Sequence, residues 1–137
     1  MSRVMYQIGE VAEAVGLSLR TIRHYEEVRL VPPSGRTAGG FRLYADDDVE
    51  RLRVVKQMKP LNFTLEEMRD LLQVREWLAA DVAGEERESL VGRVAMYAAA
   101  AQTRCETLRS ELQSPEAFTA TLRREVSRSR RASGSRP

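Results

Sequence analysis

The side chains in this chain that could do chemistry are hydrogen-bond donors suited to phosphates and base edges. Arg20, Thr21 and Arg23 lie within four residues, and His24 follows them. Arginine can donate two hydrogen bonds to a guanine edge, and each of these residue types can contact a phosphate. Residues 18–44 hold five arginines and two glutamates, a local charge of +3. The pattern favours contact with nucleic acid. The alternative is a solvated helix face, because most arginines in proteins are exposed.

A helix-turn-helix is predicted to position these donors. An apolar stripe at helical spacing comprises Val11, Ala12 and Val15. Gly16 and Leu17 then form a turn, and Ser18 is the expected N-cap of a second helix over residues 19–30. The residues on one face of this helix, at steps of three and four, are Ile22, Tyr25, Glu26 and Arg29. Arg20, Thr21, Arg23 and His24 therefore point elsewhere. Tyr25 is open to two interpretations, core packing and DNA contact.

A basic hairpin is predicted over residues 36–44. Gly39 and Gly40 supply a turn with positive φ, and residues 41–44 alternate as a strand does. Arg36 and Arg42 are the candidate contacts of this wing, with Arg42 favoured, whereas Tyr44 is expected to pack beneath it. A helix that enters a groove, beside a basic hairpin, is typical of winged-helix DNA-binding proteins.

These motifs occur in the order seen in one known family. They are Ile8–Ala12, Gly16–Ser18, Arg20–Glu26, Leu30–Pro33, Arg42–Tyr44, Asp48–Leu52 and Phe63–Glu67. Over about the first 75 residues the chain resembles the DNA-binding domain of the MerR family of transcriptional regulators. His24 stands where many members have tyrosine. Histidine can still donate to a phosphate, with a shorter and pH-sensitive contact.

The resemblance implies a set of DNA contacts and a mechanism. The implied contacts are Ser18, Arg20, Thr21, Arg23, His24, Tyr25, Arg36, Arg42 and Lys59. MerR regulators bind as homodimers to near-palindromes in promoters whose two recognition elements are spaced too far apart. The activated dimer bends and untwists this double-stranded DNA, which realigns the elements for RNA polymerase.

Helical signals continue after the wing. Asp46, Asp47 and Asp48 are expected in the first turn of a helix, where their charge suits the helix dipole. Pro60 should end or bend that helix, and Asn62 tolerates a left-handed backbone. Thr64 and Glu67 form a predicted capping box. The stripe expected to close the small domain comprises Leu65, Met68, Leu71 and Leu72.

A dimerisation helix is predicted after a boundary at Gly84, within a segment of residues 76–113. Its nearly heptad seam comprises Leu90, Val94, Tyr97, Ala101, Cys105, Leu108 and Leu112. The resemblance implies an antiparallel pairing with the same helix of a second subunit. The alternative is that the helix folds back onto its own domain.

The C-terminal part is expected to form a short helix and a disordered tail. Ser114 and Pro115 suit the start of a helix over residues 114–126, with Phe118 and Leu122 as apolar contacts. Residues 127–137 are rich in arginine and are predicted to be disordered, with non-specific phosphate contact as one use.

The composition argues against metal sites, cofactors and catalysis. Cys105 is the single cysteine and His24 the single histidine, which excludes a disulfide within the chain and argues against metal-sensing and iron–sulfur roles. We expect no cofactor. The sequence shows no nucleophile–base pair and no glycine-rich phosphate loop, so an enzyme is not expected. A pocket for a small organic effector, between the long helix and the last one, has as candidates Trp77, Met96, Tyr97 and Phe118. Such residues are more often simply core.

The whole sequence therefore predicts a mainly α protein that regulates transcription. It has 137 residues, 42% of them hydrophobic, and a net charge of +2. No apolar run approaches the roughly 18 residues of a membrane span, and a signal peptide is not apparent, so a cytoplasmic, nucleoid-associated location without membrane contact is expected. The competing interpretation is an architectural or excisionase-like accessory DNA-binding protein without an effector. A dimerisation helix favours the regulator.

Overall fold

The computed structural model describes residues 4–134 and is mainly helical, with one small sheet. Its elements in chain order are β1 (Met5–Gln7), α1 (Ile8–Val15), α2 (Leu19–Glu27), β2 (Gly35–Arg36), β3 (Arg42–Ala45), α3 (Asp46–Met58), the short 3₁₀ helix η1 (Lys59–Leu61), α4 (Leu65–Ala79) and α5 (Gly84–Gly134). The chain divides into two compact units, Met1–Tyr97 and Ala98–Pro137. The part of the chain that the structure describes contains no helix with both the length and the apolar character of a membrane span.

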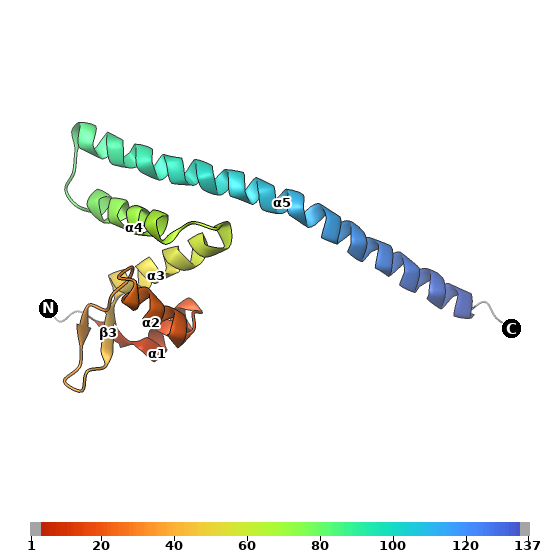
Figure 1. Cartoon of the computed structure of the whole chain (residues 1–137), viewed down its shortest axis with the longest axis horizontal. Coiled ribbons are helices and arrows are strands. Elements are labelled where there is room, and N and C mark those ends of the chain that lie inside the picture. The colour runs from red at the N-terminus through yellow and green to blue at the C-terminus, as the bar shows by residue number, and fades with distance from the viewer. Residues whose placement is uncertain (1–3, 135–137) are drawn as a thin grey trace. The chain divides into compact units, whose positions relative to one another are not determined.

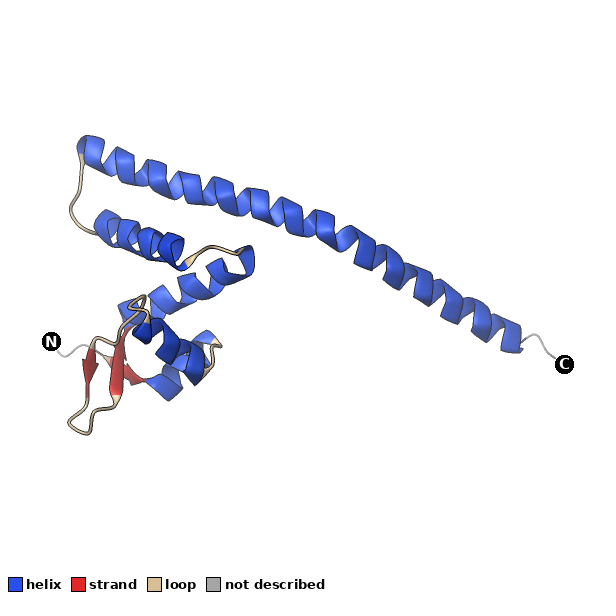
Figure 2. Ribbon diagram, in the orientation of Figure 1, coloured by secondary structure: helices blue, strands red, loops and turns tan. Residues whose placement is uncertain are grey.

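The first unit contains the predicted winged helix-turn-helix. Its helices α1 and α2 lie beside an antiparallel sheet of order β1-β3-β2, whose short strands are red in Figure 2. Sequence reasoning found the β2–β3 hairpin but missed β1, because three residues are too few to show strand alternation. The turn of the hairpin is as expected, with a φ of +85° at Gly40.

Local capping explains how the two helices are joined. Gly16 ends α1 with a φ of +77° and donates its N–H to the Ala12 carbonyl at 2.9 Å. Ser18 begins α2 and accepts the Thr21 N–H at 3.0 Å. Helix α2 ends at Glu27, three residues before the predicted end, because Arg29 takes a positive φ of +58° there.

The core of the first unit joins the sheet to the helices. Its completely buried side chains include Ile22, Val31, Tyr44, Leu52, Val55 and Val74. The burial of Tyr44 confirms that it packs beneath the wing. Asp48 is a buried carboxylate at the start of α3, and it accepts the Ala45 N–H at 2.8 Å and a hydrogen bond from Ser34. The acidic first turn of α3 is thus confirmed, and Asp48 caps the helix.

The connection from α3 to α4 follows the predicted signals. Helix α3 ends at Met58 before Pro60, and Asn62 takes a φ of +59°. Thr64 and Glu67 form the capping box through reciprocal bonds of 2.9 and 3.1 Å. In the predicted stripe, Met68 and Leu72 are buried and Leu71 is half-buried, whereas Leu65 is exposed. Leu65 is the first residue of α4 and lies at the edge of the core.

Helix α5 corrects the expected C-terminal organisation. It runs unbroken through Pro115, so the structure has no separate helix over residues 114–126, and residues 127–134 are helical rather than disordered (Figure 1). Proline removes one backbone donor, and the strong helix formers on both sides offset that loss. Residues 135–137 of the predicted tail lie outside the described part of the chain.

Candidate nucleic-acid interface

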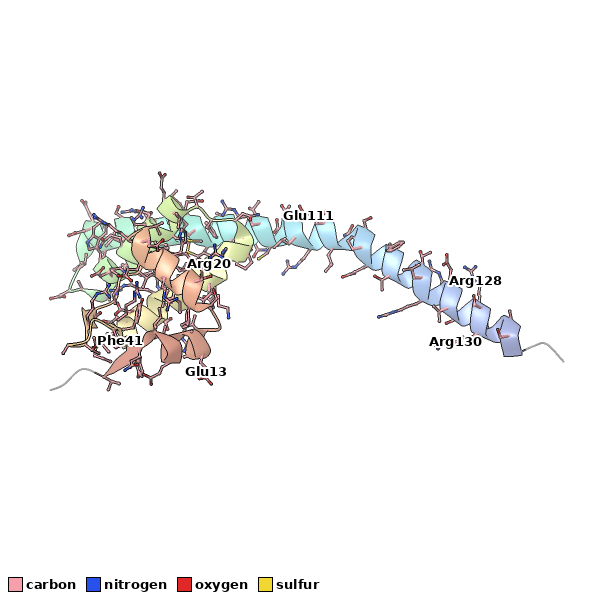
Figure 3. The ribbon with its side chains drawn as sticks, turned by 60° about the horizontal axis from the view of Figure 1, so that its bottom comes forward. Glu13, Arg20, Phe41, Glu111, Arg128 and Arg130 are labelled. Atoms are coloured by element: carbon pink, nitrogen blue, oxygen red, sulfur yellow. The ribbon has the colours of Figure 1, made fainter. Side chains whose placement is uncertain are left out.

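The outward face of α2 gathers the predicted contacts around one open hollow. Arg20, Arg23 and His24 are exposed on this helix, and Lys59 of η1 lies beside them. The hollow has a volume of about 760 Å³ and is lined by Arg20, Thr21, Arg23, His24, Tyr25, Glu27 and Lys59. Arg20 projects from α2 in Figure 3. The three cationic side chains outnumber the single carboxylate, so the hollow favours an anion.

Two hydroxyl groups mark the N-terminal end of α2. The Ser18 hydroxyl donates to Thr21 Oγ1 at 2.8 Å, while Ser18 Oγ also accepts the Thr21 N–H. Ser18 is exposed and Thr21 is half-buried. The positive end of the helix dipole lies here, which adds to the attraction for an anion.

Tyr25 belongs to the core more than to the surface. It is 3% exposed, and burial raises the pKa of its hydroxyl. Its ring centroid lies 5.9 Å from that of His24, with the rings tilted by 45°. The packing interpretation therefore describes Tyr25, whose ring lies beside that of His24 and which also lines the hollow.

The wing arginines are both held by Glu26 of α2. Arg36 and Arg42 each form an ion pair with this carboxylate, and Arg36 also donates to the Gly40 carbonyl at 3.1 Å. The hydrogen bond to Glu26 raises the pKa of Arg42. Arg36 and Arg42 are directly paired across β2 and β3, which places their side chains on the same face of the sheet.

The sequence places Glu26 on one face of α2 with Ile22 and Tyr25 but does not predict its ion pairs with the wing. The two wing strands must fold back before the contact exists, since the partners are ten and sixteen residues away. The side chain of Arg36 remains 47% exposed and that of Arg42 28% exposed. Arg36 is therefore the wing arginine with more surface left for a ligand.

The tip of the wing presents an apolar side chain that the sequence did not single out. Phe41 is exposed between Gly40 and β3, and its N–H donates to Thr37 Oγ1 at 3.0 Å. Thr37 N–H in turn donates to the Phe41 carbonyl at 2.8 Å, so the tip is closed by local bonds.

A polar cluster joins α4 to the first turns of α5 within the first unit. Asp70 accepts the Tyr97 hydroxyl at 2.7 Å and forms an ion pair with Arg93. Arg93 lies 5.8 Å from the centre of the Trp77 ring. Burial, followed by the hydrogen bond to Asp70, raises the pKa of Tyr97 to about 12. The ring of Phe63 meets that of Tyr97 edge-on at 6.0 Å.

This arrangement bears on the expected effector pocket. The pocket needed two helices, and α5 is one continuous helix. Trp77 and Tyr97 are engaged with Arg93 and Asp70, whereas Met96 and Phe118 are strongly exposed. The effector pocket stays a prediction.

The predicted dimerisation seam of α5 has a part that packs within the chain and a part that is exposed. Leu90 is 6% exposed within the single chain, and Tyr97 contacts Phe63 and Asp70. Val94, Ala101 and Cys105 are half-buried. Leu108 and Leu112 are 44% and 52% exposed. Leu90 and Tyr97 thus pack within their own chain, so only part of the predicted seam is open to a second copy.

No group of three or more His, Cys, Asp or Glu side chains that could hold a metal ion occurs among residues 4–134. Cys105 is a free thiol, half-buried on α5.

The fold and the basic face of α2 define a class, the winged helix-turn-helix proteins. Residues 6–74, half of the chain, match the family described as MerR HTH family regulatory protein. The chain belongs to this family.

A curated relative matches about half of the chain. The HTH-type transcriptional regulator ZntR of Escherichia coli (strain K12) is 42% identical over 71 residues, which are 52% of this chain and 50% of that protein. The chain thus spans about half the length of this curated relative. This relative is a transcription regulator, which is consistent with a protein that is not an enzyme.

Solved structures cover more of the chain. MtaN, the N-terminus of the Bacillus subtilis multidrug transporter activator, is 32% identical with a TM-score of 0.51, over 88% of this chain and 97% of that one. HiNmlR, a MerR family regulator lacking the sensor domain and bound to promoter DNA, is 20% identical with a TM-score of 0.54, over 96% and 95% of the two chains. At that identity the second likeness concerns the fold alone.

Proposed function

We propose that the protein is a homodimeric, sequence-specific regulator of transcription that binds double-stranded promoter DNA through α2. The observation that carries the proposal is the convergence of Arg20, Arg23 and Lys59 on one hollow of the exposed face of α2. In helix-turn-helix proteins the second helix lies in the major groove, where its first residues reach base edges.

The proposed contacts divide by chemistry. Arg20 and Arg23 read base edges or clamp phosphates, and Lys59 contacts a phosphate. Ser18, Thr21 and His24 are smaller donors that fit the DNA backbone. Tyr25 supports His24 from the core.

In this proposal the wing contributes to DNA binding through Arg36 and Arg42. Arg36 keeps more exposed surface for a phosphate, whereas Arg42 mainly holds the wing against α2 through Glu26. One carboxylate between two guanidinium groups leaves the wing with a net positive charge.

Two copies are needed for a near-palindromic operator. The exposed side chains of Leu108 and Leu112 offer an apolar stripe on α5 for a second copy, in the antiparallel arrangement that the family resemblance implies. Two winged domains held at a fixed separation can distort the DNA between them, since contacts on both half-sites supply the deformation energy. RNA polymerase is then affected indirectly, through the shape of the promoter. The proposal includes no effector.

Substitution of Arg23 tests the assignment of α2. A binding site is first selected from a pool of random duplexes, and its affinity is measured by fluorescence anisotropy. We expect Arg23→Ala to weaken binding to the selected site by roughly 1–3 kcal/mol. Arg53→Ala, an exposed arginine on α3, is the control and should change little. Unchanged affinity for Arg23→Ala would remove α2 from the interface, and a pool without an enriched sequence would favour the architectural alternative.

A further inference from the structure

Basic residues are concentrated at the end of the chain. Residues 123–137 contain six of the 22 lysines and arginines and one of the 20 acidic residues, a net charge of +5. Residues 1–122 hold the other 16 basic and 19 acidic residues, a net charge of −3. The overall charge of +2 therefore comes entirely from the last stretch of the chain.

The helix arranges this charge on one side. The arginines in the described part of this stretch are Arg123, Arg124, Arg128, Arg130 and Arg131. At about 100° per residue, they fall within an arc of about 160° around α5. Leu122 and Val126 lie outside this arc, on the other side of the helix. We call the five residues the arginine face.

The arginine face is open to solvent. Every residue from 106 to 134 is exposed, and Arg128 and Arg130 project from the last turns of α5 in Figure 3. Four of the five arginines, with Ser127, surround an open hollow of about 340 Å³. Arg124 also donates to the Thr121 hydroxyl at 3.2 Å, which keeps its side chain along the helix surface. Several guanidinium groups around one hollow suit a phosphate group.

We infer that the arginine face of α5 is a second DNA contact, separate from α2, that binds the phosphates of duplex DNA without regard to sequence. Guanidinium groups bind phosphates with paired hydrogen bonds, and every cation on this face is an arginine. Neutralised phosphates release counterions, so such a contact adds affinity that falls steeply with salt. The choice of DNA as the anion rests on the proposed function, while the preference for phosphate rests on the face itself.

Two other occupants are less suited to the face. Helices that lie on membranes carry a row of large apolar groups opposite their cations. Opposite the arginine face stand only Leu122 and Val126, and beyond Val126 the described residues include no apolar side chain larger than alanine. The acidic start of α5 in a second copy, at Glu85, Glu86 and Glu88, could also attract arginines. Dimerisation would then depend on the arginine face, which the test below measures.

The full chain with Arg123→Gln, Arg124→Gln and Arg128→Gln tests the inference. The control carries Arg→Lys at the same three positions and keeps the charge. Binding to a duplex without the selected site is measured by fluorescence anisotropy at several salt concentrations. We expect the glutamine variant to bind roughly ten- to a hundredfold more weakly at low salt, with the slope of log K against log salt reduced by about 2–3 units. The lysine variant should keep most of the slope. Circular dichroism of both variants checks that α5 stays helical.

The outcomes separate this inference from the proposed function. Equal slopes for the glutamine variant and the unmodified chain would overturn the DNA contact of α5 while leaving that of α2 intact. Loss of dimerisation in the glutamine variant, measured by sedimentation, would assign the arginines to a second copy instead. Loss of binding to phosphatidylglycerol vesicles with unchanged DNA binding would assign them to a membrane. Failure of the unmodified chain to bind any duplex would overturn the proposed function itself.

Discussion

Glu26 holds the wing against α2, the helix that we propose for DNA contact. It lies on α2 and accepts hydrogen bonds from Arg36 and Arg42, so the helix and the wing are held at a fixed separation. Its side chain is only 19% exposed, which limits the competition of water for these bonds. A substitution here should therefore affect DNA binding through the orientation of the wing.

We expect Glu26→Gln to weaken binding to the selected site by about 1–2 kcal/mol, because two charge-assisted hydrogen bonds lose their ionised acceptor. Glu27→Gln is the matched control, since Glu27 is exposed and lines the hollow on α2. Removal of the Glu27 charge should strengthen binding slightly, because it repels phosphates. Fluorescence anisotropy on the selected site measures both. If both variants bind more tightly, Glu26 does not position the wing.

Tyr97 provides a pH-dependent prediction. Burial and the hydrogen bond to Asp70 favour its neutral hydroxyl and raise its pKa from 10.0 to about 12. The neutral form thus stabilises the fold fully below pH 10, and this contribution is lost as the pH rises through 12. The tyrosinate absorbance of the unmodified chain minus that of Tyr97→Phe should show a midpoint near pH 12.

Asp70→Asn is the companion variant for this titration. It removes the carboxylate that accepts the Tyr97 hydroxyl, so the midpoint should fall. It should stay above 10.0, because burial is the larger cause of the shift. A midpoint at 10 in the unmodified chain would show that Tyr97 leaves Asp70 in solution.

The residues that sequence reasoning placed correctly are those fixed by near neighbours. Ser18 and Thr64 cap helices through residues three positions away, so their roles can be predicted from local sequence. Glu26 and Asp70 act through partners ten to 27 residues away, which only the folded chain brings close. The spacing of the donors on α2 and the family resemblance both favour DNA contact there, and that contact stays a prediction.

At the scale of elements, the turn between α1 and α2 depends on a contact as well as on backbone conformation. Lys56 of α3 donates to the Val15 carbonyl at 2.7 Å, at the C-terminal end of α1. A Cβ atom at Gly16 would lie 2.6 Å from Lys56 Nζ. The Lys56 side chain would have to move and would lose its bond.

We expect Gly16→Ala to lower the free energy of unfolding by about 1–2 kcal/mol through its positive φ. Displacement of Lys56 should lower the free energy of unfolding by about 1 kcal/mol more. Gly40→Ala is the control, because Gly40 also has a positive φ but has open space around its Cβ position. Urea denaturation compares the two variants. Equal losses for Gly16→Ala and Gly40→Ala would show that the Lys56 contact contributes nothing measurable.

Helix α5 shows why one element was predicted only in part. The local pattern at Ser114 and Pro115 matches a helix start, but a proline in a long helix costs one backbone bond, and its neighbours can sustain the helix around it. The local sequence cannot decide whether a helix starts at Ser114 or continues through Pro115, since the two conformations differ in free energy by a few kcal/mol. In α2 and α4 the capping residues predict a helix start, and no continuous helix competes with that prediction.

At the scale of the whole molecule, α5 retains an apolar stripe that its own chain leaves uncovered. Cys105, Leu108 and Leu112 are followed at heptad positions by Leu122 and Val126, because the helix continues past Pro115. Of these, Leu108, Leu112, Leu122 and Val126 are each between 44% and 52% exposed. Leu122 and Val126 thus extend the predicted stripe beyond a gap at Pro115 and Thr119, and this stripe is the surface that we propose for a second copy.

Leu108→Glu tests this surface. Since Leu108 is exposed in the single chain, the substitution should leave the fold of each copy intact. In a dimer the two carboxylates would be buried, at a cost of about 2 kcal/mol or more each. We therefore expect a monomer in sedimentation velocity at concentrations where the unmodified chain is a dimer, with loss of affinity for the selected site.

Ser110→Glu is the matched control, because residue 110 lies about 200° around α5 from residue 108 and is also exposed. It adds the same charge to the same helix away from the stripe, so the dimer and the affinity for DNA should persist. Dissociation in both variants would mean that added charge on α5, rather than burial at Leu108, drives the change. A dimer that survives Leu108→Glu would place the two-fold contact elsewhere on the chain, and the antiparallel pairing of α5 would be wrong.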